Sequence, residues 1–127
     1  MDSAKAPHQI LLVDDSAAFL AALREYVAGF PQLRVAATAV TGEQAVALAE
    51  LLSPDLVLMD LEMPGIGGLE ATRIIKALPR RPQIVMVTLH DVARLRRAAL
   101  EAGADFHIVK GRLHDEFPAV VARMAQS

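Results

Sequence analysis

Four short, mainly apolar segments of the sequence end on polar residues that can bind metals or phosphate. The segments cover residues 10–13, 56–59, 84–87 and 106–109, and the polar residues after them are Asp14, Asp15, Asp60, Thr88 and Lys110. Neighbouring carboxylates repel one another, by about 4 kcal/mol per pair at roughly 4 Å and an effective dielectric of about 20. Protonation of one carboxylate or a bound divalent cation relieves this repulsion. An aspartate after an apolar segment also commonly begins a turn, so Asp60 alone does not define a site.

The same residue types suit phosphoryl transfer to a carboxylate. Oxygen ligands suit Mg²⁺, which binds proteins through one or two carboxylates together with phosphate oxygens. Lys110 supplies a positive charge for a phosphate oxygen, and Thr88 supplies a hydroxyl donor. A carboxylate is a known nucleophile for phosphoryl transfer and forms an aspartyl phosphate. The residues therefore predict a site where Asp60 is phosphorylated while Mg²⁺ and Lys110 neutralise charge.

These side chains can act together only if the fold brings the ends of the four segments to one place. Short apolar segments bounded by turn residues predict buried strands, and residues 33–40 predict a further strand. Apolar residues three or four positions apart predict a helix after each strand. We therefore expect five strands and five helices in alternation, with parallel strands and right-handed crossovers. The carboxyl ends of parallel strands lie at one edge of the sheet, where open α/β sheets bind ligands.

Capping and periodicity predict where the helices begin and which residues face the core. The predicted N-caps are Ser16, Thr41, Asp91 and Asp115. Gln44, three residues after the second of these, gives the spacing of a capping box. Pro118 would lie in the first turn of the last helix, where proline is tolerated. The residues predicted to face the core include Leu52, Ile74 and Val92.

The composition indicates a single domain without thiol chemistry. The chain has 127 residues, enough for one domain, and we expect residues 1–7 to form a tail and residues 8–127 the folded domain. The absence of cysteine excludes disulfides and thiolate metal sites. A net charge of −2 without a long basic run disfavours direct binding to nucleic acid. No signal-peptide pattern or membrane-length apolar segment is present, which predicts a cytoplasmic domain with no membrane partner.

At these motifs the sequence resembles the receiver domain of bacterial two-component response regulators. The resemblance covers roughly residues 8–126, and the segments that carry it are residues 11–16, 56–65, 85–88 and 103–105, together with Lys110. It implies a flavodoxin-like α/β fold, which is a three-layer (βα)₅ sandwich with parallel strand order 2-1-3-4-5.

The resemblance also implies how the site binds metal and receives phosphate. A sensor histidine kinase, or a small phosphodonor, would phosphorylate Asp60 in a reaction that requires Mg²⁺. Asp15 and Asp60 would bind the ion directly, together with the backbone carbonyl of Glu62, whereas Asp14 would bind it through water. The residues that would contact the phosphoryl group are Thr88 and Lys110.

The resemblance further implies a signalling role rather than an enzyme that acts on other substrates. The domain would catalyse only its own phosphorylation and dephosphorylation. Thr88 and the residue at position 107 would transmit phosphorylation to the face made by the fourth helix, last strand and fifth helix. An output domain or effector protein would bind there. Residues 88–91 and 110–111 resemble receivers joined to DNA-binding domains, although no such domain is visible in this chain, and a homodimer remains open.

Several residues depart from the family pattern. His107 stands where the family usually has Tyr or Phe, which suggests a weaker or partly pH-dependent switch. The alternative is an ordinary surface histidine, as we also expect for His8, His90 and His114, because the four histidines lack metal-ligand spacing. Glu62 and His90 lie two residues beyond Asp60 and Thr88. In the family these two positions tune dephosphorylation, and the alternative is two solvated side chains.

Two other classes of function remain open from the residues alone. An aspartyl-phosphate phosphatase would place a second acid two residues after its nucleophile, where Glu62 lies, but the surrounding residues do not match that motif. A phosphate-independent binding scaffold would usually have lost the acidic pair, the acceptor aspartate or the lysine, and all of these are present.

Overall fold

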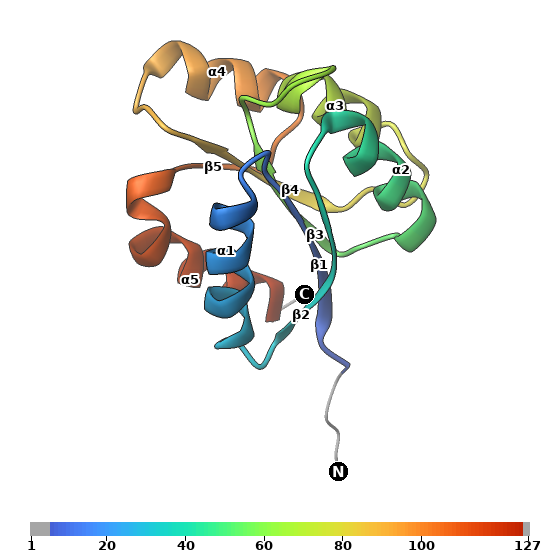
Figure 1. Cartoon of the computed structure of the whole chain (residues 1–127), viewed down its shortest axis with the longest axis vertical. Helices are drawn as coiled ribbons and strands as arrows, with labels where there is room; N and C mark the ends of the chain where they lie inside the picture. The colour runs from blue at the N-terminus through green and yellow to red at the C-terminus, as the bar shows by residue number, and fades with distance from the viewer. Residues whose placement is uncertain (1–5, 126–127) are drawn as a thin grey trace.

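The computed structural model describes residues 6–125, in which five strands alternate with five helices (Figure 1). The strands are β1 (His8–Val13), β2 (Leu33–Ala39), β3 (Leu56–Asp60), β4 (Gln83–Thr88) and β5 (Phe106–Val109). The helices are α1 (Ala17–Ala28), α2 (Gly42–Leu52), α3 (Gly67–Lys76), α4 (Ala93–Glu101) and α5 (Leu113–Ala125), and the 3₁₀ turn η1 (Lys110–Arg112) precedes α5. Residues 1–5 of the expected tail and residues 126–127 of the expected domain lie outside the described residues.

The described strands form one parallel sheet in the order β2-β1-β3-β4-β5. Val13 at the end of β1 lies beside Met59 of β3, and Asp60 lies beside Val87 of β4. The carboxyl ends of the central strands are therefore level at one edge. The predicted flavodoxin-like topology is confirmed.

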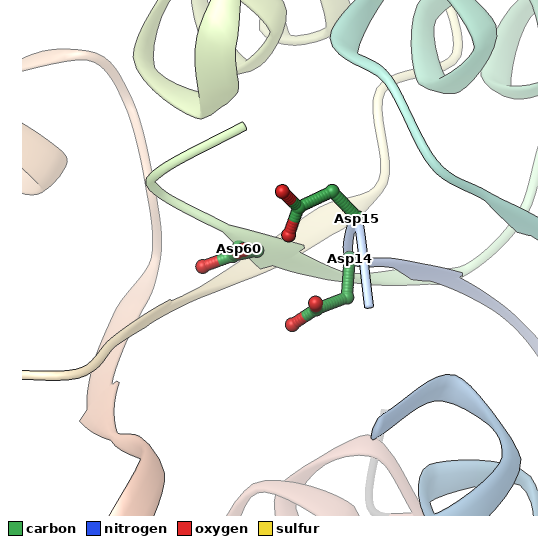
Figure 2. A group of neighbouring side chains, drawn as sticks. All are labelled: Asp14, Asp15 and Asp60. Carbon is green, nitrogen blue, oxygen red and sulfur yellow. The ribbon is translucent and has the colours of Figure 1, made fainter. Parts of the chain in front are cut away.

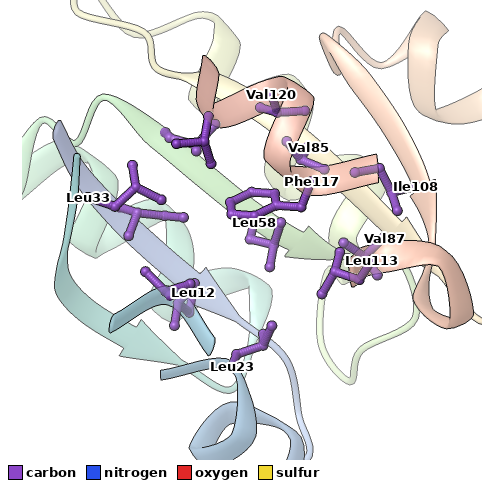
Figure 3. Packing of buried hydrophobic residues seen from close by; sticks show 14 of the residues in the cluster. Leu12, Leu23, Leu33, Leu58, Val85, Val87, Ile108, Leu113, Phe117 and Val120 are labelled. Carbon is purple, nitrogen blue, oxygen red and sulfur yellow. The ribbon is translucent and has the colours of Figure 1, made fainter. Parts of the chain in front are cut away.

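Successive residues of the central strands point into two separate apolar layers. On one side, Leu58 of β3 belongs to a cluster completed by α1 and by Phe117 of α5 (Figure 3). On the other side, Val57 packs in a cluster that includes Ala71 of α3 and Ala99 of α4. Figure 1 shows α1 and α5 together on one face, with α2, α3 and α4 on the other. Because the sheet is covered on both faces, the fold is the predicted three-layer sandwich.

Helix α4 is held to the sheet by few side chains. Ala99 alone is buried among the residues of α4, all of which are described, and Leu100 is 48% exposed. Val92 was predicted to face the core but is 39% exposed and occupies the N-cap position without a side-chain hydrogen bond. The prediction that Asp91 caps this helix is also wrong, because its carboxylate pairs with Arg112 at 3.2 Å.

Other helix ends partly follow the predictions. Ser16 Oγ accepts a hydrogen bond from the Phe19 amide at 3.1 Å, so this cap is confirmed. Thr41 caps α2, but Gln44 Oε1 accepts from the amide of Val40 at 2.9 Å, one residue before the position of a capping box.

The start of α5 and two core positions were predicted wrongly. Helix α5 begins at Leu113, directly after η1, so Asp115 is not its N-cap and Pro118 lies inside the helix rather than in its first turn. Leu52 and Ile74 are 39% and 37% exposed, because they lie at the margins of the apolar faces of α2 and α3. Within the described residues, no helix combines the length and apolar character that crossing a membrane requires.

Candidate functional site

The polar residues singled out in the sequence gather at the carboxyl edge of the sheet. Asp14 follows β1, Asp60 ends β3 and Thr88 ends β4. Thr88 lies beside Val109, the last residue of β5, and Lys110 follows Val109 directly. The parallel register therefore brings these residues to one rim, as the strand-end argument predicted.

Three carboxylates form the centre of this rim. Figure 2 shows Asp14 and Asp15 at the end of β1, near Asp60 at the end of β3. One carboxylate oxygen from each of the three lies within 4.8 Å of the others. Asp14 and Asp60 are 1% and 5% exposed, whereas Asp15 is open to solvent. The group combines two buried acids with one accessible acid.

Backbone amides orient the two buried carboxylates. Asp14 Oδ1 accepts a hydrogen bond from the Ser16 amide at 2.8 Å, and Asp60 Oδ1 accepts from the Glu62 amide at 3.4 Å. A further hydrogen bond closes the loop after β3, in which the Gly68 amide donates to the Leu61 carbonyl at 3.1 Å. The local chain thus holds both acids before any ligand binds.

Lys110 lies in the site but contacts a different acid from the one expected to carry phosphate. Its Nζ lies 2.8 Å from Asp14 Oδ2 and 4.3 Å from the centre of the Phe19 ring. The Asp14 contact is an ion pair between a buried carboxylate and a largely buried ammonium group. Phe19 on α1 therefore helps to place the ammonium group through a cation–π contact. No motif in the sequence indicated that Phe19 contributes to the site.

The surroundings of Asp60 disfavour its charged form. The pKa of its carboxyl is raised to about 6, first by burial and then by the negative charge of Asp14. Lys110 and the Glu62 amide lower this pKa and Asp15 raises it, with smaller effects. Asp60 therefore loses its proton only near neutral pH, because its charged form is disfavoured. A nearby cation would reduce the free-energy cost of this charge.

Thr88 and His107 form a buried polar pair beside the acidic group. Thr88 is fully buried, and its Oγ1 lies 2.9 Å from His107 Nε2 and 3.1 Å from the carbonyl oxygen of His90. His107 is only 7% exposed, so the alternative of an ordinary surface histidine is wrong for this residue. His90 and His114 are exposed, as predicted, and His8 is partly buried. Because β4 and β5 are neighbours, Met86 and His107 pair in register and bring the imidazole beneath Thr88.

The acidic group has the chemistry of a site for a hydrated divalent cation. Asp14 Oδ2 is buried and already faces one positive charge, the ammonium group of Lys110 at 2.8 Å. One carboxylate oxygen from each acid lies within 4.8 Å of the others, so all three can face one hydrated cation. The residues present therefore fit Mg²⁺.

Fold and site together define a class: flavodoxin-like α/β domains with an acidic site at the carboxyl edge of the sheet. The family model for the response regulator receiver domain matches residues 10–122. The chain therefore belongs to the response regulator receiver domain family.

Relatives and solved structures agree with this assignment. The chain is 37% identical to Response regulator UvrY of Escherichia coli (strain K12) over 112 residues, which cover 88% of this chain and 51% of that protein. It is also 40% identical to a protein-glutamate methylesterase/protein-glutamine glutaminase of Aliivibrio fischeri. The 97 matched residues cover 76% of this chain and 26% of the enzyme. A LuxR-family two-component response regulator from Aurantimonas has 32% identity and a TM-score of 0.83, over 93% of this chain and 87% of that structure. The chain thus spans about half the length of UvrY and a quarter of the methylesterase.

Proposed function

We propose that this chain is a phosphoacceptor signalling domain in which Asp60 receives a phosphoryl group from a sensor histidine kinase. The observation that carries the proposal is the position of Asp60, buried at the end of β3 with two further carboxylates within 4.8 Å. The kinase is inferred from the family, since relatives of this chain are response regulators.

In the proposed reaction, a carboxylate oxygen of Asp60 attacks phosphorus. The new bond is an acyl phosphate, and the bond that breaks joins phosphorus to a donor nitrogen in a kinase phosphohistidine, or to a donor oxygen in acetyl phosphate. The ammonium group of Lys110 moves from Asp14 to the phosphoryl oxygens. The Thr88 hydroxyl donates a hydrogen bond to one of these oxygens. Bound Mg²⁺ would supply positive charge that reduces repulsion between donor and acceptor.

The residues proposed to hold the ion are those inferred from the resemblance. Asp15 and Asp60 would bind it directly with the carbonyl of Glu62, and Asp14 would bind it through water. Asp14 is buried and places a carboxylate oxygen within 4.8 Å of those of the other two acids, which supports its inclusion. Its ion pair with Lys110 at 2.8 Å implies that the ion and the ammonium group compete for the same acid.

The proposed output is a change in the face formed by α4, β5 and α5. Thr88 and His107 would connect the phosphoryl group to that face, because they are in contact with each other and His107 belongs to β5. A partner protein or an output domain, such as a DNA-binding domain, would recognise the face, either alone or as a homodimer. We propose that the domain catalyses only its own phosphorylation and dephosphorylation.

The direct test is labelling with acetyl phosphate. The wild-type chain should gain one base-labile phosphoryl group, measured by intact-protein mass spectrometry, and chelation of Mg²⁺ should prevent this. The Asp60→Asn variant should gain none, whereas Glu25→Gln, which changes an exposed acid on α1, should be labelled like wild type. Equal labelling of Asp60→Asn would refute the proposal. Multiple turnovers of a small phosphoester would instead favour the phosphatase alternative.

The lifetime of the label tests the roles proposed for Glu62 and His90. Both side chains are exposed beside the site, one beyond Asp60 and the other beyond Thr88, so both can contact an attacking water. We expect Glu62→Ala and His90→Ala each to change the first-order rate of label loss by more than about twofold, the scale of one weak hydrogen bond. Decay would be followed after removal of acetyl phosphate, with Glu25→Gln as the control. Unchanged rates in both variants would show that these are merely solvated side chains.

A further inference from the structure

We propose that His107 is a positioning residue for Thr88: its Nε2–H donates to Thr88 Oγ1, so the threonine hydroxyl can act only as a donor toward the acidic site. This inference rests on the proposed phosphorylation of Asp60. It concerns the direction of one proton, which the residue types alone do not define.

The argument begins with the number of protons available. A threonine hydroxyl has one proton, and a backbone carbonyl can only accept. The contact of 3.1 Å between Thr88 Oγ1 and the His90 carbonyl oxygen therefore uses the hydroxyl proton. The second contact, of 2.9 Å between Thr88 Oγ1 and His107 Nε2, must then be made with a proton on the imidazole. This assigns His107 the tautomer with the proton on Nε2 and none on Nδ1.

The opposite tautomer is the more costly one. If Thr88 donated to Nε2, the proton of neutral His107 would be on Nδ1, which is buried and has no hydrogen-bond partner. The His90 carbonyl, which also accepts from the Val92 amide at 3.1 Å, would then lie 3.1 Å from the threonine oxygen with no proton between the two oxygens, which repel each other. The assigned tautomer avoids this repulsion and leaves an acceptor rather than a donor unpaired on Nδ1. It is therefore the favoured arrangement.

The charged groups around the imidazole agree with a neutral ring. Burial lowers the pKa of His107 below its ordinary value of 6.5, and the positive charge of Arg96 on α4 lowers it too. Asp91, before α4, and Glu116, on α5, act in the opposite direction with smaller effects. Protonation of the ring would also place a second N–H on the unpartnered Nδ1. His107 therefore remains a one-proton donor at pH 7.

This arrangement prepares Thr88 for its proposed contact with phosphate. His107 occupies one lone pair of the hydroxyl oxygen, so the proton points away from the imidazole. When Asp60 carries a phosphoryl group, the Thr88 hydroxyl can turn from the His90 carbonyl and donate its hydrogen bond to a phosphoryl oxygen. His107 need not change its own protonation or tautomer. A residue without an N–H at this point would leave the hydroxyl free to orient in other directions.

Two measurements test the inference. The first is ¹⁵N NMR of unphosphorylated wild type at pH 7, because a nitrogen without a proton resonates far downfield of a protonated one. The His107 signals are assigned by their loss in His107→Gln. We expect a neutral ring with the proton on Nε2. A proton on Nδ1, or on both nitrogens, would overturn the proposal whatever happens to phosphorylation.

The second measurement compares two substitutions at this position. His107→Gln retains an N–H donor at a similar distance from the backbone, whereas His107→Phe retains a flat ring without a donor. We expect His107→Phe to slow labelling of Asp60 by acetyl phosphate about threefold to tenfold, the scale of one hydrogen bond. His107→Gln should stay within about twofold of wild type.

These results separate the positioning role from the proposed function. Labelling at Asp60 should persist in both variants, and its loss in Asp60→Asn tests the function alone. Equal rates in His107→Gln and His107→Phe would overturn the positioning role while leaving the phosphoacceptor intact. Thermal unfolding followed by circular dichroism identifies a variant that fails to fold, and in that case the NMR result decides.

Discussion

The Asp60→Asn variant is expected to be more stable than the wild-type chain, by about 2–3 kcal/mol at pH 7 without divalent cations. The reason is that the pKa of Asp60 is raised from 3.8 to about 6 in the folded chain, so folding disfavours the charged form. A group with a raised pKa contributes stability below its unfolded pKa and loses that contribution as the pH rises through the folded pKa. Asparagine has a similar shape and no charge, so it avoids this loss.

The pH dependence of this difference is the sharper measurement. Urea unfolding at several pH values should show the two chains diverging between about pH 4 and pH 7 and nearly equal below pH 4. Glu25→Gln, on the exposed surface of α1, should track wild type. Mg²⁺ should stabilise wild type more than Asp60→Asn, because the variant has lost a proposed ligand. If the wild-type chain were as stable as the variant at pH 7, the pKa of Asp60 would not be raised in the folded chain.

The Gly68→Ala variant is expected to lose about 3 kcal/mol of stability and to be phosphorylated more slowly. A Cβ on Gly68 would lie 2.2 Å from the carbonyl oxygen of Asp60 and 2.8 Å from the Cα of Leu61. Both are backbone atoms, so the methyl group fits only if α3 or the end of β3 moves. Alanine is the better helix former by about 1 kcal/mol, but the steric cost exceeds this gain.

Gly111→Ala is the matched control for this substitution. Gly111 lies in η1 close to Lys110, and a Cβ there would meet nothing within 4 Å. Its stability should therefore stay within about 0.5 kcal/mol of wild type. Unfolding by urea and the rate of labelling by acetyl phosphate would be measured for both variants. A stable Gly68→Ala with normal labelling would mean that the contact between α3 and β3 relaxes without disturbing Asp60.

The location of the site could be predicted because it depends on topology. Apolar segments that are buried on both faces predict parallel strands, and parallel strands bring their carboxyl ends together. Asp14, Asp60 and Thr88 each end or follow such a strand, so their convergence needed no knowledge of side-chain packing. The acidic group was therefore predictable from the strand ends, whereas the strand order was expected only from the resemblance to receiver domains.

The details that were missed depend on contacts between distant segments. Lys110 pairs with Asp14 and lies over the Phe19 ring of α1, and no sequence spacing encodes these two contacts. An ordinary surface histidine was one alternative for His107, but the residue is only 7% exposed and pairs with Met86 of β4. Asp91 can either cap α4 or pair with Arg112, and in the structure it forms the ion pair.

The weak attachment of α4 has a consequence for the energetics of signalling. Among the residues of this helix, a single alanine is buried, so α4 itself contributes little apolar area to its contact with the sheet. Local opening there requires far less free energy than opening of the central strands, whose side chains are almost wholly enclosed. Amide hydrogen exchange should therefore be faster in α4 than in the central strands.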